Sequence, residues 1–140
     1  MRIVSVASVS PIARDADAAK SLYEKALGLS FEGGEGDYVF TEQLPGVRHL
    51  GLWPLTEAAK ACFGGAEWPS DIPVPQASVE FEVGSVEDVA GAAQELRASG
   101  HELLHDSRQE PWGQTITRLL SRDGLLVGIC YTPWFHELRA

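Results

Sequence analysis

The chain has 140 residues, of which 44% are hydrophobic, and its 11 Lys or Arg against 20 Asp or Glu give a formal net charge of −9. This charge argues against nucleic-acid binding, which needs a basic face. No apolar run could span a membrane and no signal-peptide pattern opens the chain, so we expect a cytoplasmic protein without a membrane partner. Its two cysteines, Cys62 and Cys130, are expected to be reduced and buried.

The first half predicts one helix among four strands. The expected strands lie at residues 3–9, 29–32, 37–42 and 48–53. Pro11 is expected to start a turn after the first strand, and residues 33–36 form a second, glycine-rich turn. The helix should begin after an Asp15 N-cap, carry an apolar stripe of Ala18, Leu22 and Ala26, and stop at Gly28.

A proline-rich connector separates this unit from the next. Residues 56–63 predict a short helical turn that ends the first unit, residues 1–63. Residues 64–76 contain Pro69, Pro73 and Pro75 and predict a linker. The second unit is then residues 77–140, and both units together make a single domain of residues 1–140.

The second half repeats the order of the first. Its expected strands lie at residues 77–83, 102–105, 114–120 and 125–131. Ser85, with Asp88 three residues later, is a good N-cap for a helix over residues 86–99. Each half is therefore β-α-β-β-β, and the expected fold class is α+β.

Strict alternation along residues 77–83 assigns the two faces of that strand. Val79, Phe81 and Val83 share one face, which should be buried beneath the helix. Ser78, Glu80 and Glu82 share the other face, and this polar surface predicts a wet pocket wall on the concave side of the sheet.

Three short motifs add to the repeat. These are Leu22-Tyr23-Glu24-Lys25-Ala26-Leu27-Gly28, Pro111-Trp112-Gly113 and Arg122-Asp123-Gly124. In this order and spacing the chain resembles the vicinal oxygen chelate superfamily, which includes glyoxalase I, extradiol dioxygenases, fosfomycin-resistance enzymes and bleomycin-resistance proteins. The resemblance implies a curved mixed sheet built from two βαβββ repeats with the helices outside (the glyoxalase/bleomycin-resistance fold), and a homodimer.

In metal-using members of that superfamily, the ligands come from the opening and closing strands of each unit. The resemblance places Ser8 and Ser78 where histidines would lie, and Gly51 and Gly128 where glutamates would lie. Serine and glycine supply neither imidazole nor carboxylate, so we expect no metal and no cofactor. This pattern resembles the drug-binding branch, whose members hold an antibiotic without altering it, and these four positions become candidate pocket positions.

Aromatic residues are the other candidate ligand contacts. Trp112 resembles the tryptophan of the bleomycin-resistance groove, although it could instead cap the sheet edge. Trp53 and His49 share strand parity with Gly51 and should face the concavity, unless Trp53 packs on the connector. Tyr38 and Phe40 lie on one face of their strand and are either core or pocket wall. Trp68, Trp134 and Phe135 are expected to pack between units or subunits.

Polar candidates are fewer. Glu80 could contact a cationic ligand, or be solvated, or pair with Arg118, whereas Glu82 is expected to be solvated. His101 and His105 would lie too far apart on a strand to share a metal, and His136 is expected at the surface. The sequence has no phosphate loop and no G-x-S-x-G elbow.

These observations predict a metal-free binding protein, rather than an enzyme, that sequesters an aromatic antibiotic or natural product and so confers resistance. The alternative is a metal-dependent lyase, isomerase or dioxygenase whose ion is held by displaced ligands such as His49 and Glu80. A regulatory protein that senses a small ligand remains a third interpretation.

Overall fold

The computed structural model describes residues 1–33 and 36–137, and within them eight strands form one mixed sheet in the order β2-β3-β4-β1-β5-β8-β7-β6. The strands are β1 (Ser5–Ala13), β2 (Glu32–Gly33), β3 (Val39–Thr41), β4 (Leu50–Pro54), β5 (Ala77–Glu82), β6 (His105–Gln109), β7 (Thr115–Leu120) and β8 (Leu125–Tyr131). The helices are α1 (Ala16–Lys20), η1 (Ser21–Ala26), α2 (Leu55–Phe63), α3 (Val86–Ala98) and η2 (Pro133–Phe135). This α+β architecture confirms the fold class expected from the sequence.

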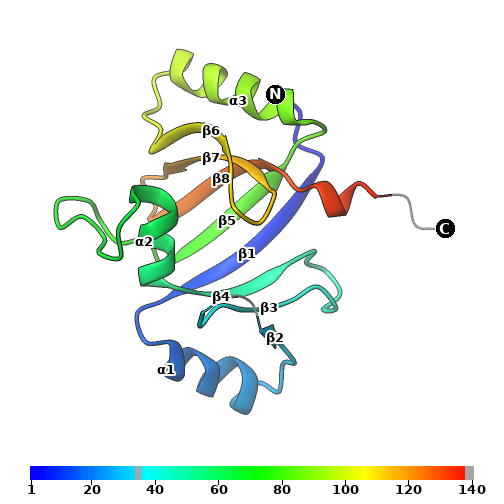
Figure 1. Ribbon diagram of the computed structural model, residues 1–140, viewed down its shortest axis with the longest axis vertical. Coiled ribbons are helices and arrows are strands. Elements are labelled where there is room, and N and C mark those ends of the chain that lie inside the picture. Colours follow the sequence, from blue (N-terminus) through cyan, green and yellow to red (C-terminus); the bar gives the residue numbers. More distant parts are fainter. Residues whose placement is uncertain (34–35, 138–140) are drawn as a thin grey trace.

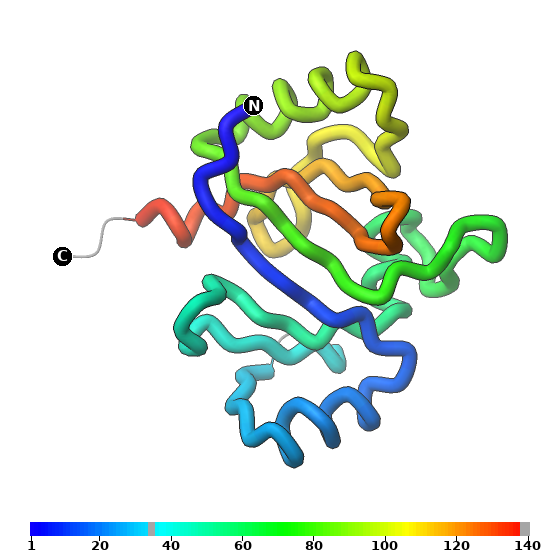
Figure 2. Tube along the Cα trace, turned by 180° about the vertical axis from the view of Figure 1, so that it is seen from behind, coloured from blue at the N-terminus to red at the C-terminus, as the bar shows by residue number. Residues whose placement is uncertain are grey.

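The two halves meet at the centre of the sheet. β1 and β5 pair antiparallel, with Val9 opposite Val79 and Ser8 opposite Glu80. Each of these strands also pairs in parallel with the last strand of its own half, β1 with β4 and β5 with β8. Figure 1 shows α1 and α3 at opposite ends of the molecule, and Figure 2 shows β1 and β5 side by side across the other face.

A buried apolar cluster attaches α3 to the sheet. Val83 and Ile129 pack against Val89 and Ala92 of the helix, and Phe81 lies against the same cluster. The Ser85 side chain caps α3 by accepting a hydrogen bond of 3.2 Å from the Asp88 backbone N–H. The sequence alternation therefore assigned the helix side of β5 correctly.

β1 is longer than the sequence indicates, and the expected turn at Pro11 is wrong. The backbone N–H groups of Val9 and Ile12 donate to His49 O at 3.0 Å and to Gln76 O at 2.9 Å. Pairing on both sides of Pro11 is thus maintained although proline itself has no N–H to donate. The extension carries Ser10 onto the same face as Ser8.

The first helix also departs from expectation. Asp15 is its N-cap, accepting a 3.0 Å hydrogen bond from the Ala18 N–H, but after Lys20 the helix widens into the π-helix η1. The proposed apolar stripe is wrong, because no residue of α1 or η1 is buried and Leu22 is 50% exposed. Local periodicity predicted a helix here but not how little of it the sheet covers.

β6 begins where the sequence predicted a strand to end. The sequence analysis expects a strand at residues 102–105, whereas β6 covers His105–Gln109 and has the polar sequence His-Asp-Ser-Arg-Gln. It is an edge strand held by its hydrogen bonds to β7, so it needs no apolar face. Of the glycine-rich turn at residues 33–36, residues 34 and 35 lie outside the described residues.

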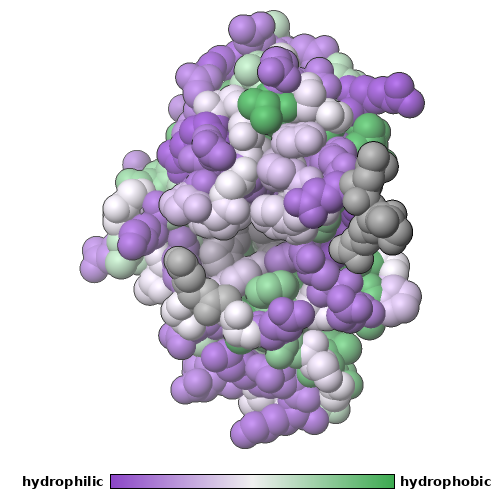
Figure 3. All heavy atoms as spheres, turned by 45° about the vertical axis from the view of Figure 1, so that its right-hand side comes forward, coloured by the Kyte–Doolittle hydropathy of each residue, from purple (hydrophilic) through white to green (hydrophobic). Residues whose placement is uncertain are grey.

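The face of the molecule shown in Figure 3 carries many strongly hydrophilic side chains. No helix in the described part of the chain is both long and apolar enough to span a membrane. Cys62 and Cys130 are both buried and free.

Candidate ligand-binding cavity

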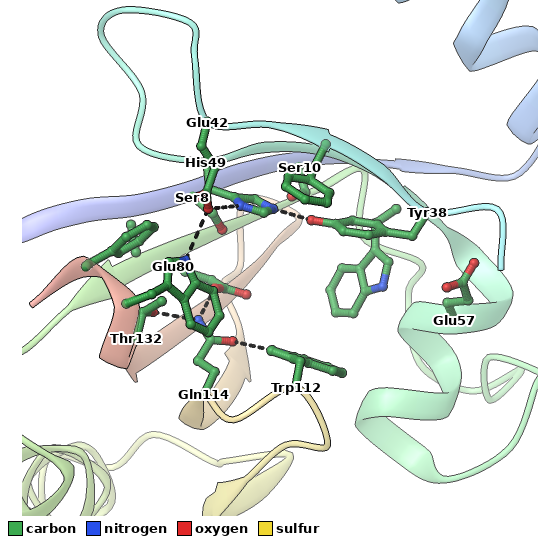
Figure 4. A pocket seen from close by; sticks show the side chains of 15 residues that line it. Ser8, Ser10, Tyr38, Glu42, His49, Glu57, Glu80, Trp112, Gln114 and Thr132 are labelled. Atoms are coloured by element: carbon green, nitrogen blue, oxygen red, sulfur yellow. Dashed lines mark hydrogen bonds and ion pairs between the residues drawn. The ribbon is translucent and has the colours of Figure 1, made fainter. Parts of the chain in front are cut away.

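A cavity of about 420 Å³ opens on the face of the sheet opposite α3 (Figure 4), within the size range of small-molecule sites. Six aromatic side chains and three glutamates share its wall. The lining residues are Ala7, Ser8, Ser10, Tyr38, Phe40, Glu42, His49, Trp53, Glu57, Glu80, Trp112, Gln114, Thr132, Trp134 and Phe135. They come from both halves of the chain, so the cavity lies where the repeats meet.

Strand register explains one wall. Phe40 of β3 lies opposite Gly51 of β4, and side chains two residues apart on a strand share a face. Tyr38 and Glu42 therefore join Phe40, while His49 and Trp53 join Gly51, on the side that faces the cavity. The parity argument made from the sequence for His49 and Trp53 holds in the structure.

A chain of hydrogen bonds runs along this wall. His49 Nδ1 lies 2.7 Å from Glu42 Oε2, and His49 Nε2 contacts the hydroxyl of Tyr38. With the carboxylate accepting from Nδ1–H, Nε2 is left as the acceptor for the Tyr38 O–H. Trp134 Nε1 donates to the same glutamate oxygen at 3.3 Å. Figure 4 shows Glu42, His49 and Tyr38 in this spatial order along one side of the cavity.

Ring stacking holds the same side chains in place. The Tyr38 and Phe40 rings lie within 10° of the His49 plane, with the Phe40 and His49 centroids 5.0 Å apart. Gly51 makes this arrangement possible, because a Cβ there would come within 2.8 Å of the Tyr38 ring. The Tyr38 phenol thus occupies the space that a side chain at residue 51 would need.

Gln114 organises the opposite wall. Its amide nitrogen donates to Glu80 Oε1 at 2.9 Å and to Thr132 Oγ1 at 3.0 Å. Its amide oxygen accepts from Trp112 Nε1 at 3.0 Å, so the half-exposed indole has a fixed orientation at the cavity. Arg118 pairs with Glu110 at 2.9 Å, and the hydrogen bonds and ion pairs of the described residues include none between Arg118 and Glu80.

The cavity is electrically one-sided. Glu42, Glu57 and Glu80 contribute carboxyl groups, and the lining residues that the structure describes include neither lysine nor arginine. Burial, with the Glu80 carboxylate next in importance, raises the pKa of the Tyr38 hydroxyl above its usual range. A negative charge on a ligand would be opposed here, and a positive charge would be attracted.

Seven of the ten site residues predicted from sequence line this cavity: Trp112, Trp53, His49, Tyr38, Phe40, Glu80 and Ser8. Ser78 is only 1% exposed, and Gly51 and Gly128 present no side chain, so these three lie off the lining.

One expectation made for residues around the cavity is corrected. Glu82 is 0% exposed rather than solvated, because it accepts hydrogen bonds from Thr132 N and from His136 Nε2 at 2.8 Å. His136 itself lies at the surface, as expected. Trp134 and Phe135 pack between the two units, as expected, since Trp134 donates to Glu42 and Phe135 lies under the Arg48 guanidinium, and both also line the cavity.

Several lining residues were not anticipated from the sequence. Glu42, Gln114 and Thr132 lie at or just beyond strand ends, and Glu57 comes from α2. Strand parity would have indicated Glu42, which is two residues beyond Phe40. Trp134 is 92 residues from its partner Glu42, and no local pattern predicts such a contact.

The family model described as Glyoxalase/Bleomycin resistance protein/Dioxygenase superfamily matches residues 5–129, nearly the whole chain. The chain belongs to this superfamily, which confirms the resemblance seen in the sequence motifs. A search of curated proteins finds no match.

Solved structures support the superfamily fold. A superfamily member from Vibrio splendidus 12B01 aligns with a TM-score of 0.56 at 17% identity, covering 94% of this chain and 98% of its own. Methylmalonyl-CoA epimerase from Streptomyces coelicolor aligns at 0.54 and 18%, covering 94% and 96%. A Legionella pneumophila protein described as an NAD-dependent benzaldehyde dehydrogenase aligns at 0.62 and 15%, covering 89% and 96%. At these identities the likeness concerns the fold.

The residues present do not fit the metal that some superfamily members use. A Cβ at Gly51 would strike Tyr38, and one at Gly128 would lie 2.7 Å from Ile116, so neither position has room for a glutamate. His49 already uses both ring nitrogens, and Glu80 is bonded to Gln114. Among the described residues, no three His, Cys, Asp or Glu side chains are placed together to hold an ion.

Proposed function

We propose that this superfamily member binds a flat aromatic antibiotic or similar natural product that carries a positive charge, and that it confers resistance by sequestering the compound. One observation carries the proposal: a single cavity combines six aromatic side chains with three glutamates. Stacking on indole and phenyl faces supplies affinity for flat rings, and the carboxylates select a cation.

Trp112 gives the first test. Its indole is 50% exposed, yet its N–H is held by Gln114, so it can stack on a ligand without first being ordered. Trp112→Ala should weaken binding of an aromatic cation between about twofold and tenfold, from roughly 0.5–1.5 kcal/mol of lost ring contact. Titration followed by tryptophan fluorescence measures this, and unchanged affinity would remove Trp112 from the site.

Charge selectivity gives the second test, with two tricyclic probes of similar shape. The cation 9-aminoacridine should bind and the anion 9-anthracenecarboxylate should not. Glu80→Gln should weaken binding of the cation, whereas Glu102→Gln, a matched change at an exposed site away from the cavity, should not. Tighter binding of the anion would refute the proposed ligand class.

The proposed resistance must be tested in cells. A susceptible strain that expresses the protein should survive higher concentrations of a cationic aromatic antibiotic than the same strain with Trp112→Ala, and the drug recovered from the protein should have unchanged mass. The metal-dependent alternative predicts a full equivalent of Zn, Ni, Mn or Fe in the purified protein, which elemental analysis would detect.

A further inference from the structure

The hydrogen-bonded chain Glu42–His49–Tyr38 does more than simple binding requires. A pocket that only stacked flat ligands would need aromatic faces, whereas this chain connects a carboxylate through an imidazole to a phenol that lies on the cavity wall. Carboxylate, imidazole and hydroxyl in this order are the arrangement that moves a proton to and from a bound molecule.

The three groups are held rigidly in that order. The Tyr38 and Phe40 rings lie within 10° of the His49 plane, and the His49 side chain is only 16% exposed. The indole N–H of Trp134 fixes the Glu42 oxygen that receives His49 Nδ1–H. The glycine at residue 51 gives the phenol space to lie flat and reach His49 Nε2. Preorganisation of this kind removes the reorganisation cost from a proton transfer.

The state of the phenol determines how such a transfer would run. Because burial and Glu80 raise its pKa, the Tyr38 hydroxyl is neutral near pH 7. It cannot act as a base unless its own proton leaves in the same step, and His49 Nε2 is the acceptor already in contact with it. The imidazolium that results would lie 2.7 Å from the Glu42 carboxylate, which stabilises it.

We propose that Tyr38, with His49 and Glu42, catalyses reversible proton transfer at a carbon acid of the bound ligand, an activity that rests on the ligand-binding function proposed above. The ligand C–H bond breaks and an O–H bond forms on Tyr38 Oη. At the same time the Tyr38 O–H bond breaks and an N–H bond forms on His49 Nε2. The C–H electron pair stays on the ligand, and the reverse steps return the proton to the same or another ligand atom.

The charge of the cavity specifies which carbon acid is suitable. An enolate would place a new negative charge beside Glu42 and Glu80, whose carboxylates would oppose it. A cationic carbon acid, with the C–H next to an iminium or a quaternised ring nitrogen, becomes neutral when it loses the proton. The positive charge then moves to His49, and the total charge of the complex does not change. The ligand class is therefore an aromatic cation that can lose a proton from carbon to give a neutral enamine.

The probe for this activity is 1,2-dimethylquinolinium, a flat cation whose 2-methyl group loses a proton to give a neutral base. In D₂O the signal of the 2-methyl group in the proton NMR spectrum should disappear at least about tenfold faster with saturating protein than in buffer of the same pD. The N-methyl signal should remain and serves as an internal reference. Tyr38→Phe and His49→Gln should each return the rate to near the buffer value. Tyr23→Phe and His101→Gln, which change the same residue types outside the cavity, should exchange at the wild-type rate.

Glu42 is a positioning residue and needs a separate readout. Glu42→Gln keeps an oxygen that accepts from His49 Nδ1–H but removes its charge, so the exchange rate at saturation should fall while the dissociation constant changes little. If Glu42 had a purely structural role, Glu42→Gln would change the exchange rate and the dissociation constant together, or lower the thermal unfolding midpoint. Circular dichroism melts of all variants identify any that fail to fold, and the folded ones among Tyr38→Phe, His49→Gln and Glu42→Gln then decide the result.

Two failures are distinguishable. If the probe quenches tryptophan fluorescence but its methyl protons exchange at the buffer rate, or equally fast in Tyr38→Phe, the relay is wrong and the binding function stands. If the probe produces neither quenching nor exchange, the proposed function fails and the relay fails with it.

Discussion

Gly51 shows how the absence of one side chain shapes the cavity. The phenol of Tyr38 lies where a Cβ would project, and its hydroxyl reaches His49 only because that space is open. The superfamily resemblance predicts that residue 51 corresponds to a glutamate of metal-using members. A glycine at that position would provide room for a phenol beside an imidazole instead of a carboxylate ligand.

Gly51→Ala should destabilise the fold and displace Tyr38. Forcing a methyl group into a filled space costs roughly 1–3 kcal/mol in the free energy of unfolding, measurable by urea denaturation. Gly65→Ala is the matched control, because a Cβ there meets nothing within 4 Å and residue 65 has no positive φ. Equal stability of the two variants would mean that Tyr38 has another position available at no cost.

His105 links one side chain to the pH dependence of stability. Burial, with Arg118 contributing in the same direction, lowers the pKa of His105 in the folded protein, although a backbone hydrogen bond at Asp106 opposes this. The unfolded chain then binds a proton more readily, near the ordinary histidine pKa of about 6.5. The contribution of His105 to stability is thus fully present above pH 6.5 and declines as the pH falls below it.

His105→Gln should therefore make the free energy of unfolding less dependent on pH in the window just below 6.5. Denaturation of both proteins at pH 7.5, 6.5 and 5.5 measures the difference. If the variant instead lost more stability on acidification than the wild type, the pKa of His105 would not be lowered in the folded protein.

Elements differ in how well their sequences specify them. α3 and β8 follow closely from sequence, because Ser85 caps the helix and β8 is an apolar run that follows the turn at Arg122-Asp123-Gly124. β6 and the end of β1 do not, since their pairing depends on neighbouring strands rather than on their own apolar pattern. For the cavity, strand parity identified His49 and Trp53, whereas Trp134 reaches it through a contact that only the folded chain defines.

α3 offers an elementary test of helix propensity. Gly91 lies in its interior, exposed, and a Cβ at this position would meet no neighbouring atom within 4 Å. Gly91→Ala should raise the free energy of unfolding by about 0.5–1 kcal/mol, because alanine loses less backbone entropy in a helix. Gly100→Ala, where φ is +90°, should do the opposite, and stabilisation by both changes would contradict this argument.

Across the chain as a unit, the net charge of −9 and the acidic cavity act in the same direction. Together they favour the approach and the retention of cations. Salt should weaken this effect, since the screening length falls from about 10 Å at 0.1 M to about 3 Å at 1 M.

The affinity for 9-aminoacridine should therefore decrease as NaCl rises from 0.05 to 0.5 M, roughly as exposed charge interactions are screened. A neutral tricyclic probe such as anthracene-9-methanol should bind with little salt dependence, because ring stacking involves no net charge. Fluorescence titrations at four salt concentrations measure both slopes. Equal slopes would show that the carboxylates do not contribute to ligand selection.

Trp112, Trp134 and Phe135 belong to a turn and a 3₁₀-helix rather than to the strand ladder. Their identities can change without breaking a hydrogen bond between strands, whereas Tyr38 and Phe40 adjoin or belong to a paired strand. A directed-evolution library confined to these three positions should therefore vary the ligand that the cavity accepts while the strand pairing remains unchanged, with the narrowest choice at residue 135, which also packs against the buried cluster of Ala7, Ile116 and Cys130.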